Sequence, residues 1–357
     1  MKIKQQNINK SLLILLSLSF FVRAVLAMIV EFGNDEVYYW TYAMYPDWSH
    51  FDHPPMVGWL IQLFSCNLLF DSEFFLRLSS VIFMTINTYL VFLIGKQVKN
   101  EQTGFYAALL YTASIYAFVI TGIFILPDTP LSIFTLLAVL QFVKYFQYEK
   151  NKHLLLAGLF TGLAMLSKYS GAFVWVGVGL YVIIYARKEF NNPFLYLSVL
   201  ISAVCMLPVL IWNLNNDFIS FTFHGGRVGF FGDFHPEYFL TEIIGELGYN
   251  NPVNYVLIII SLVALIKGKN FIADMPKRLI LCLSLPLILL FWFFSLTREI
   301  LPHWTAPSFV LLLIFVAAQL ADKYEVKDEN VIIPKSIVVS LSVLMITLIL
   351  GVTEIKT

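Results

Sequence analysis

The feature that most constrains this chain is a series of long apolar runs, most of them close to the length at which a helix crosses a bilayer. The first covers residues 11–30, and about 20 apolar residues in a helix span ~30 Å of hydrocarbon. Further runs follow at residues 76–95, 103–120, 130–147, 153–168, 170–186, 194–213, 252–266, 279–296, 305–321 and 336–351. With 59% hydrophobic residues and a mean hydropathy of +0.78, the sequence predicts an all-α polytopic membrane protein with about eleven transmembrane helices.

Basic side chains gather in alternate loops, which predicts how the chain is oriented, because loops rich in Lys and Arg stay in the cytoplasm. One set of loops holds Lys2, Lys4, Lys10, Lys96, Lys99, Lys150, Lys152, Arg187, Lys188, Lys267, Lys269, Lys277, Arg278, Lys323 and Lys327. The other set holds Arg77, Lys168, Arg227, Arg298 and Lys356, with five of the six histidines. We therefore expect the second set to face outward and to carry any chemistry.

The sequence predicts one membrane domain over residues 1–357, with external loops at 32–75 and 213–251. The basic segment Met1–Lys10 precedes an apolar run without a small-residue cleavage site, so we expect an uncleaved first helix whose amino end is cytoplasmic. The cysteines lack the CxxC spacing of zinc sites and suggest no disulfide framework. They are Cys66, Cys205 and Cys282.

The first external loop opens with two adjacent acids in an aromatic segment. Asp35 and Glu36 precede Tyr38 and Tyr39, and aromatic rings with polar tips favour the boundary of the membrane. Carboxylates at the end of a span can remove a proton from a hydroxyl or amine, bind a cation, or only stop the helix from sliding inward. We interpret the pair as catalytic, and the alternative is a solvated interfacial loop.

A second motif in this loop joins an acid and an imidazole to two prolines. Pro54 and Pro55 restrict the backbone, so they set the directions of the Asp52 and His53 side chains. A carboxylate and an imidazole held in this way can share a metal ion or a phosphate. The same residues also suit the start of the helix that follows, and both interpretations can hold.

Two outer helix boundaries carry further candidates. Asp128, next to Thr129, can cap the helix that follows or contact a substrate. Lys168, followed by Tyr169, ends an apolar helix, where a lysine needs an anion or a route to the surface.

The last candidates lie in the second external loop and near residue 300. His224 and Arg227 flank two glycines, and the guanidinium fork can clamp phosphate oxygens. The alternative for this segment is an amphipathic helix at the interface. Arg298 and His303 precede Trp304, which by itself is typical of an ordinary interfacial belt.

Taken in order, these segments resemble the bacterial lipid-linked-sugar glycosyltransferases of the C-type membrane fold, the group that contains the lipid A aminoarabinose transferase and the protein O-mannosyltransferases. The resemblance runs from Asp35 to Pro307 through the motifs NDEVYYW, FDHPPMVGWLI, LPDTPLSIF, GLFTGLAMLSKYSG, PVLIWNLNNDFISFTFHGGR and LPHW. It implies the C-type glycosyltransferase fold with interfacial helices in two external loops. The chain ends soon after Leu350, so we expect it to lack the additional outer domain of longer members.

The resemblance also implies an activity. A sugar would move from a polyprenyl phosphate to a lipid A, glycan or protein acceptor at the outer face of the bacterial inner membrane, with membrane lipids and no nucleic acid as further surroundings. Asp35 is the implied base, with Glu36 beside it. The residues implied for the donor phosphate are His53, Lys168, Arg227 and Arg298. Those implied for the substrate are Tyr38, Tyr39, Asp128, Tyr169 and His303. A divalent metal on Asp52 and His224 is a further arrangement that the family allows.

The expected reaction is a single displacement with inversion. The phosphate leaves in the company of cations while Asp35 takes the proton of the acceptor. No nucleotide is needed, and Gly177 and Gly179, which lie within an apolar run, are attributed to helix packing. One rival is a transporter or flippase of a lipid-linked sugar, whose charges should line a path across the membrane, whereas here only Arg23 and Lys144 lie inside helices. The other rival is a structural subunit in which the acids are idle.

Overall fold

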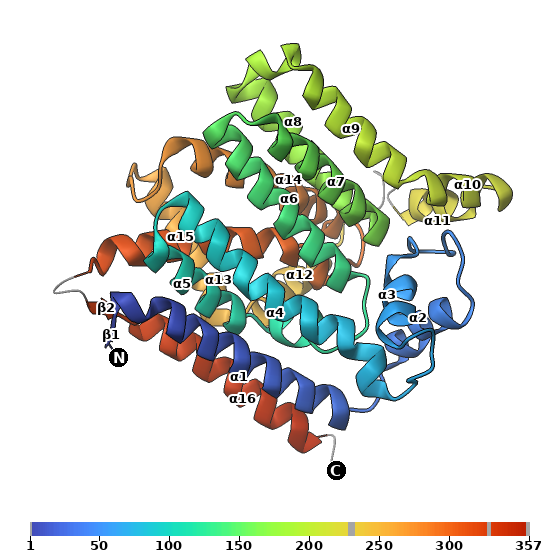
Figure 1. The fold of residues 1–357 in the computed structure, drawn as a ribbon, viewed down its shortest axis with the longest axis horizontal. Coiled ribbons are helices and arrows are strands. Elements are labelled where there is room, and N and C mark those ends of the chain that lie inside the picture. The colour runs from blue at the N-terminus through green and yellow to red at the C-terminus, as the bar shows by residue number, and fades with distance from the viewer. Residues whose placement is uncertain (1, 228–232, 327–329, 355–357) are drawn as a thin grey trace.

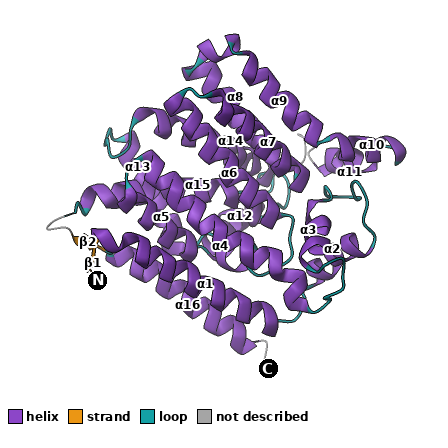
Figure 2. Cartoon of the chain, viewed as in Figure 1, coloured by secondary structure: helices purple, strands orange, loops and turns teal. Residues whose placement is uncertain are grey.

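The computed structural model describes residues 2–227, 233–326 and 330–354. Within these ranges the chain forms a helical bundle, and the strands are limited to one short pair (Figure 2). β1 (Lys2–Lys4) and β2 (Asn330–Ile332) run antiparallel, with Lys2 opposite Ile332. The prediction of an all-α architecture is confirmed.

Each predicted apolar run contains a helix. The first half has α1 (Ile8–Ile29), α2 (Asn34–Met44), α3 (Met56–Phe64), α4 (Glu73–Val98), α5 (Glu101–Ala113), α6 (Asp128–Tyr148), α7 (Asn151–Ser167) and α8 (Phe173–Tyr185). The second half has α9 (Pro193–Cys205), α10 (Leu207–Asn215), α11 (Ile219–Arg227), α12 (Pro236–Tyr249), α13 (Pro252–Ile266), α14 (Asp274–Ser295), α15 (Ala306–Lys323) and α16 (Lys335–Glu354). Single turns occur at η1 (Gln5–Asn7), η2 (Tyr116–Ile120), η3 (Tyr169–Ala172), η4 (Arg187–Asn191) and η5 (Pro302–Trp304).

The chain is a multi-pass membrane protein, although the number of crossings differs from the prediction. In the described ranges six helices are long and apolar enough to cross a membrane, or up to eight if each of two bent pairs is one crossing. These pairs are α9 with α10, bent by 44°, and α12 with α13, bent by 106°. Helices α5 and α8 have 13 residues each and α7 has 17, which is short for ~30 Å of hydrocarbon at about 1.5 Å per residue. The count of about eleven is not confirmed.

Asparagines define several helix starts. The Asn100 side chain accepts a hydrogen bond from the main-chain N–H of Thr103 and caps α5. Asn192 and Asn251 do the same for α9 and α13, each followed by a proline, which suits the first helical position because its missing N–H would have no partner there. Asn251 has a φ of 69°, so this residue turns the chain sharply between α12 and α13.

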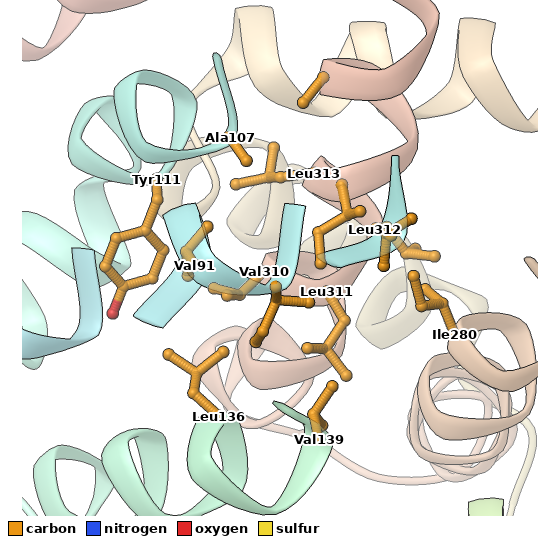
Figure 3. Packing of buried hydrophobic residues seen from close by; sticks show 14 of the residues in the cluster. Val91, Ala107, Tyr111, Leu136, Val139, Ile280, Val310, Leu311, Leu312 and Leu313 are labelled. Atoms are coloured by element: carbon orange, nitrogen blue, oxygen red, sulfur yellow. The ribbon is translucent and has the colours of Figure 1, made fainter. Parts of the chain in front are cut away.

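The centre of the bundle is formed by α4, α5, α6 and α15. Figure 3 shows Val310 of α15 between Val91 of α4 and Leu136 of α6, with Leu311 near Val139, and all of these side chains are buried. Lipid tails are as apolar as these side chains, so close packing rather than exclusion of water holds the helices together.

The two segments predicted as external loops meet at one end of the bundle. Figure 1 shows α2, α3, α10 and α11 gathered there, while β1 and β2 lie at the opposite end. The indole of Trp212 donates to Asp47 Oδ2 at 2.7 Å, and Ser220 Oγ donates to the carbonyl of His50 at 3.0 Å. These bonds connect the two loops, both of which carry short helices, as the resemblance implies.

Candidate active site

The start of α2 places two adjacent carboxylates in different surroundings. Asp35 and Glu36 occupy the first turn, where negative charge is favourable near the unpaired N–H groups of a helix. Successive residues of a helix point in directions about 100° apart, so only one of the two faces the bundle. The Asp35 side chain is exposed and makes no hydrogen bond or ion pair with any described residue, whereas Glu36 is buried.

Glu36 is enclosed in a buried ion pair, and its predicted share in catalysis stays a prediction. Its Oε1 and Oε2 accept bonds of 2.8 and 2.6 Å from the guanidinium of Arg77, which is also fully buried. The carboxylate further accepts the main-chain N–H groups of Ile125 and Gly33 at 3.0 and 3.1 Å. Arg77 in turn donates to the carbonyl oxygens at the end of α1. With both oxygens occupied, Glu36 joins α1, α2, α4 and the segment before α6.

Asp52 is held by hydroxyl groups of α2. Tyr38 and Tyr42 donate to its Oδ1 at 2.8 and 2.5 Å, and His53 Nδ1 lies 3.1 Å from Oδ2. Burial alone would raise the pKa of the Asp52 carboxyl, but the neighbouring imidazole and the two hydroxyls outweigh burial and hold this pKa below its usual range. The ring of His50 stacks on Tyr42 with 3.6 Å between centroids. The loop after α2 is thereby fixed against that helix.

His224 of α11 completes this part of the site. Its Nε2 donates to the main-chain carbonyl of Asp52 at 2.6 Å, because a carbonyl oxygen can only accept. Its ring lies edge-on to His53 at 6.3 Å and to Tyr169 at 5.0 Å. Phe51 and Phe223 pack beside it with centroids 4.6 Å apart. The first and second loops therefore share one polar surface.

The predicted metal pair is close together, but its donor atoms are engaged otherwise. The Asp52 carboxylate accepts two tyrosine hydroxyls, and Nε2 of His224 bonds to the main-chain carbonyl of Asp52. In the described part of the chain, no three His, Cys, Asp or Glu side chains are grouped so that they could hold a metal ion. The residues present do not fit a metal site, and we derive no step through one.

A buried ion pair lies beside this surface. Lys168, in the extended link between α7 and η3, donates from Nζ to Asp128 Oδ2 at 2.8 Å, and both side chains are largely buried. Asp128 also accepts the hydroxyl of Tyr116 at 3.1 Å. The Lys168 ammonium lies 6.0 Å from the centre of the Trp304 ring. The N-cap of α6 is Pro127, without a side-chain cap bond, so Asp128 contacts Lys168, which is predicted to bind the donor phosphate, and does not act as the cap.

The His303 imidazole of η5 lies close enough to this ion pair and to the first external loop for their charges to affect its pKa. Burial lowers the pKa of its imidazole to about 4, and the opposing effect of Asp128 is smaller. The charges of Lys168, Asp35 and His53 also act on this ring. His303 is therefore neutral near pH 7, and three separate segments of the chain lie within electrostatic reach of it.

The other predicted residues occupy the same end of the bundle. Tyr39 is buried, and burial together with the carboxylates of Asp52, Asp128 and Asp35 raises the pKa of its hydroxyl. Arg298 donates to the carbonyl of Gly226 at 3.2 Å. Arg227 ends α11, and its side chain lies outside the described residues.

Sequence reasoning missed Arg77, Tyr42 and Tyr116. Arg77 stood among the outer cations, and no local pattern showed that Glu36, which is 41 positions earlier, is its partner. Tyr42 follows Tyr38 by one helical turn, so its contact with the same acid could have been found from an i, i+4 pattern. Tyr116 lies in a run that we read as an unbroken helix, but the π-type turn η2 bends there.

Comparison with known proteins supports this architecture. The family model described as dolichyl-phosphate-mannose-protein mannosyltransferase matches residues 52–212. The structure of ArnT from Cupriavidus metallidurans bound to undecaprenyl phosphate superimposes with a TM-score of 0.67, at 16% identity, over 87% of this chain and 59% of that one. The Archaeoglobus fulgidus oligosaccharyltransferase gives 0.53, at 16% identity, over 88% and 51%. The chain has the C-type glycosyltransferase fold.

The C-type fold confirms what the motifs implied about the architecture. A curated relative with a similar sequence is the lipid A galacturonosyltransferase RgtD of Rhizobium johnstonii, which is 23% identical over 286 residues. That match covers 78% of this chain and 59% of the relative. The chain therefore spans between half and three fifths of the length of the proteins it matches.

Proposed function

We propose that this chain is a membrane glycosyltransferase that moves a sugar from a polyprenyl phosphate to a hydroxyl or amine of an envelope acceptor at the outer face of the membrane. The observation that carries the proposal is Asp35, an exposed carboxylate without a partner among the described residues. It lies at the end of the bundle that also holds Lys168, His53 and Arg298. Glycosyl transfer from a phosphate needs a base for the acceptor proton and cations for the leaving phosphate, and both kinds of group lie at this end.

The comparisons support the class of donor and of acceptor. ArnT was solved with undecaprenyl phosphate, and RgtD is named for transfer of galacturonate to lipid A. The family model is named for a mannosyl donor on dolichyl phosphate. Two of these names give a polyprenyl phosphate, and two give a transferred sugar, which is galacturonate in one and mannose in the other. The proposal for this chain accordingly names the donor class and leaves the sugar to experiment.

The chemistry is a displacement at the anomeric carbon. The acceptor oxygen or nitrogen forms a bond to this carbon, the bond from the carbon to the phosphate oxygen breaks, and polyprenyl monophosphate leaves with the electron pair. The acceptor proton passes to Asp35 and then to water. Lys168 neutralises charge that develops on the phosphate, and Asp128 holds its ammonium in place at 2.8 Å. Attack opposite the leaving group inverts the configuration.

Loss of the Asp35 carboxylate tests the proposal. We expect Asp35→Asn to lower the rate of transfer from polyprenyl-phosphate sugars by about 10²- to 10⁴-fold, as for removal of a general base. The assay uses the purified full chain in detergent with a panel of such donors and a lipid A acceptor. Asp71→Asn is the matched control, because Asp71 is an exposed acid in the same loop.

Full transfer by the Asp35→Asn variant would contradict the assigned base. Movement of the donor across vesicle membranes without formation of product would favour the transporter instead. A parallel assay with a chelator tests whether any metal ion takes part. Undiminished transfer in the chelator would argue against a required metal ion.

A further inference from the structure

A hollow lies at the end of the bundle opposite Asp35. Its volume is 420 Å³. It is lined by Tyr145, Phe146, Glu149, Tyr181, Tyr185, Ala186, Arg187, Lys188 and Glu189. Tyr145 follows Asp128 by 17 positions in α6, a distance of about 25 Å along the helix. In the orientation predicted from the basic loops, this end faces the cytoplasm.

The walls of the hollow are a continuous set of aromatic rings. Phe146 of α6 lies between Tyr145, at 5.1 Å, and Tyr181 of α8, at 4.6 Å between centroids. Tyr185 continues the set one turn further, 5.7 Å from Tyr181, and about half of its surface is exposed. The faces of such rings carry partial negative charge and attract cations, most strongly where several rings meet. The guanidinium of Arg278 lies over the Tyr185 ring, 4.9 Å from its centre, so the rings of Tyr145, Phe146 and Tyr181 are the ones left for a ligand cation.

Charges of both signs surround these rings. Glu189 is buried, and one oxygen of its carboxylate accepts the hydroxyl of Tyr145. Glu149 and Lys188 form an exposed ion pair at the rim. Arg187 is exposed, and its Nε donates to the carbonyl of Ile183 at 2.8 Å. Its terminal nitrogens bond to no described residue, so they are available to an anion.

We propose that this hollow binds the phosphoethanolamine headgroup of a membrane phospholipid. The ammonium group of the lipid lies among the tyrosine rings and pairs with the carboxylates of Glu189 and Glu149. The phosphate group pairs with the guanidinium of Arg187. A headgroup with negative charge alone would be repelled by the buried Glu189. A ligand with positive charge alone would not use the arginine.

The surface beside the hollow favours a lipid over a soluble ligand. The exposed side of α8 is apolar and leads directly to Tyr185. It consists of Val176, Leu180, Ile183 and Ile184. Acyl chains attached to the headgroup can lie along this apolar face. A free metabolite has no acyl chains and would leave the face uncovered. The site is separate from the proposed catalytic residues, and it stands or falls independently of the transfer reaction.

Competition between two phospholipids tests the site. The full chain is purified in detergent, stripped of lipid and mixed with equal amounts of phosphatidylethanolamine and phosphatidylglycerol that carry the same acyl chains. Native mass spectrometry then counts the lipids retained. We expect one phosphatidylethanolamine to be retained in preference, and Tyr185→Ala and Glu189→Gln to reduce this retention about fivefold or more. Tyr89→Ala is the control, because Tyr89 is similarly exposed on α4.

Three results would overturn the proposal. The first is equal or stronger retention of phosphatidylglycerol, and the second is retention that neither variant changes. The third is competition by free glycerophosphoethanolamine at the concentration of the lipid, which would indicate a soluble ligand. Size-exclusion profiles show whether each variant folds. If Glu189→Gln does not fold, the exposed rim variant Glu149→Gln replaces it, with the same expected loss.

Discussion

At the scale of single residues, the first turn of α2 shows how neighbours in sequence acquire different roles. Asp35 is exposed to solvent, whereas the Glu36 carboxylate is enclosed by Arg77 and two main-chain N–H groups. The difference arises from helix geometry, since adjacent positions face directions about 100° apart. Chemical type alone does not distinguish the two acids.

Glu36→Gln should destabilise the protein more than it impairs chemistry. Removing one partner of a buried ion pair leaves the other charge uncompensated and costs about 3–5 kcal/mol. We expect a clear fall in the thermal unfolding temperature in detergent, with residual transfer by the folded fraction. Glu73→Gln is the matched control: Glu73 lies 3.7 Å from the same Arg77 but is 43% exposed, so its loss should cost only about 0–1 kcal/mol. Equal destabilisation by the two variants would refute the structural role.

His303 should make stability depend on acid pH. Burial lowers the pKa of its imidazole to about 4 in the folded protein, whereas the pKa in an unfolded chain is about 6.5. The unfolded state therefore binds more protons between these values, and this contribution to stability is present above about pH 6.5 and is lost as the pH falls towards 4. We expect the unfolding temperature to fall over this range and His303→Gln to reduce the fall. The surface variant His235→Gln should retain most of this fall in unfolding temperature. An identical pH profile for wild type and His303→Gln would contradict the role given to the His303 imidazole.

At the scale of helices, close packing distinguishes the two glycines of α8. A Cβ on Gly177 would lie 2.6 Å from the carbonyl oxygen of Cys282 and 2.7 Å from Leu283 Cα, both in α14. A Cβ on Gly179 would meet nothing within 4 Å. The attribution of both glycines to helix packing is correct for Gly177 and wrong for Gly179.

Alanine at these two positions should have opposite effects. Gly177→Ala forces α8 away from α14, since backbone atoms cannot move aside, and we expect a lower thermal unfolding temperature and a lower yield of folded protein. Gly179→Ala should be neutral or stabilising by up to about 1 kcal/mol, because alanine favours a helix. Measuring both variants in the same detergent controls for helix propensity. Tolerance of Gly177→Ala would show that the two helices are less tightly packed than the structure indicates.

At the scale of the whole molecule, segments far apart in sequence converge on one end of the bundle (Figure 1). The Trp212 indole bonds to Asp47, and His224 bonds to the carbonyl of Asp52, 172 positions away. These contacts require both loops to lie on the same side of the membrane. The hollow that contains Lys188 lies at the opposite end.

Labelling from outside the cell should separate these two ends. Cys66 is an exposed native thiol in the first loop, so we expect a membrane-impermeant maleimide to modify it in intact spheroplasts. In a Cys66→Ser background that carries Lys188→Cys, labelling should occur only after permeabilisation. The Cys66→Ser variant alone reports any background from Cys205 and Cys282. Labelling of the cysteine at position 188 in intact spheroplasts would contradict the proposed orientation. The candidate active site around Asp35 would then face the cytoplasm.

Local patterns in the sequence were sufficient for the class of fold, and the site residues stay a prediction. Apolar runs predict helices wherever they occur, because an unpaired main-chain polar group is too costly in hydrocarbon. Motif order indicated that Asp52, His53, Lys168 and His224 belong to one site, and the structure places them at one end of the bundle. The number of crossings was less predictable, since a bend such as that at Asn251 depends on one residue and its packing.

The sequence by itself determined that the chain is helical and that it lies in the membrane, since these properties follow from residue type and spacing. Only the tertiary structure decided which acid is enclosed and which is open. Glu36 meets Arg77 because α2 and α4 pack together, and Asp52 meets Tyr42 because the loop folds back on α2. The physical reason is that a carboxylate takes its role from the charges and hydrogen-bond donors around it, and these come from distant parts of the chain.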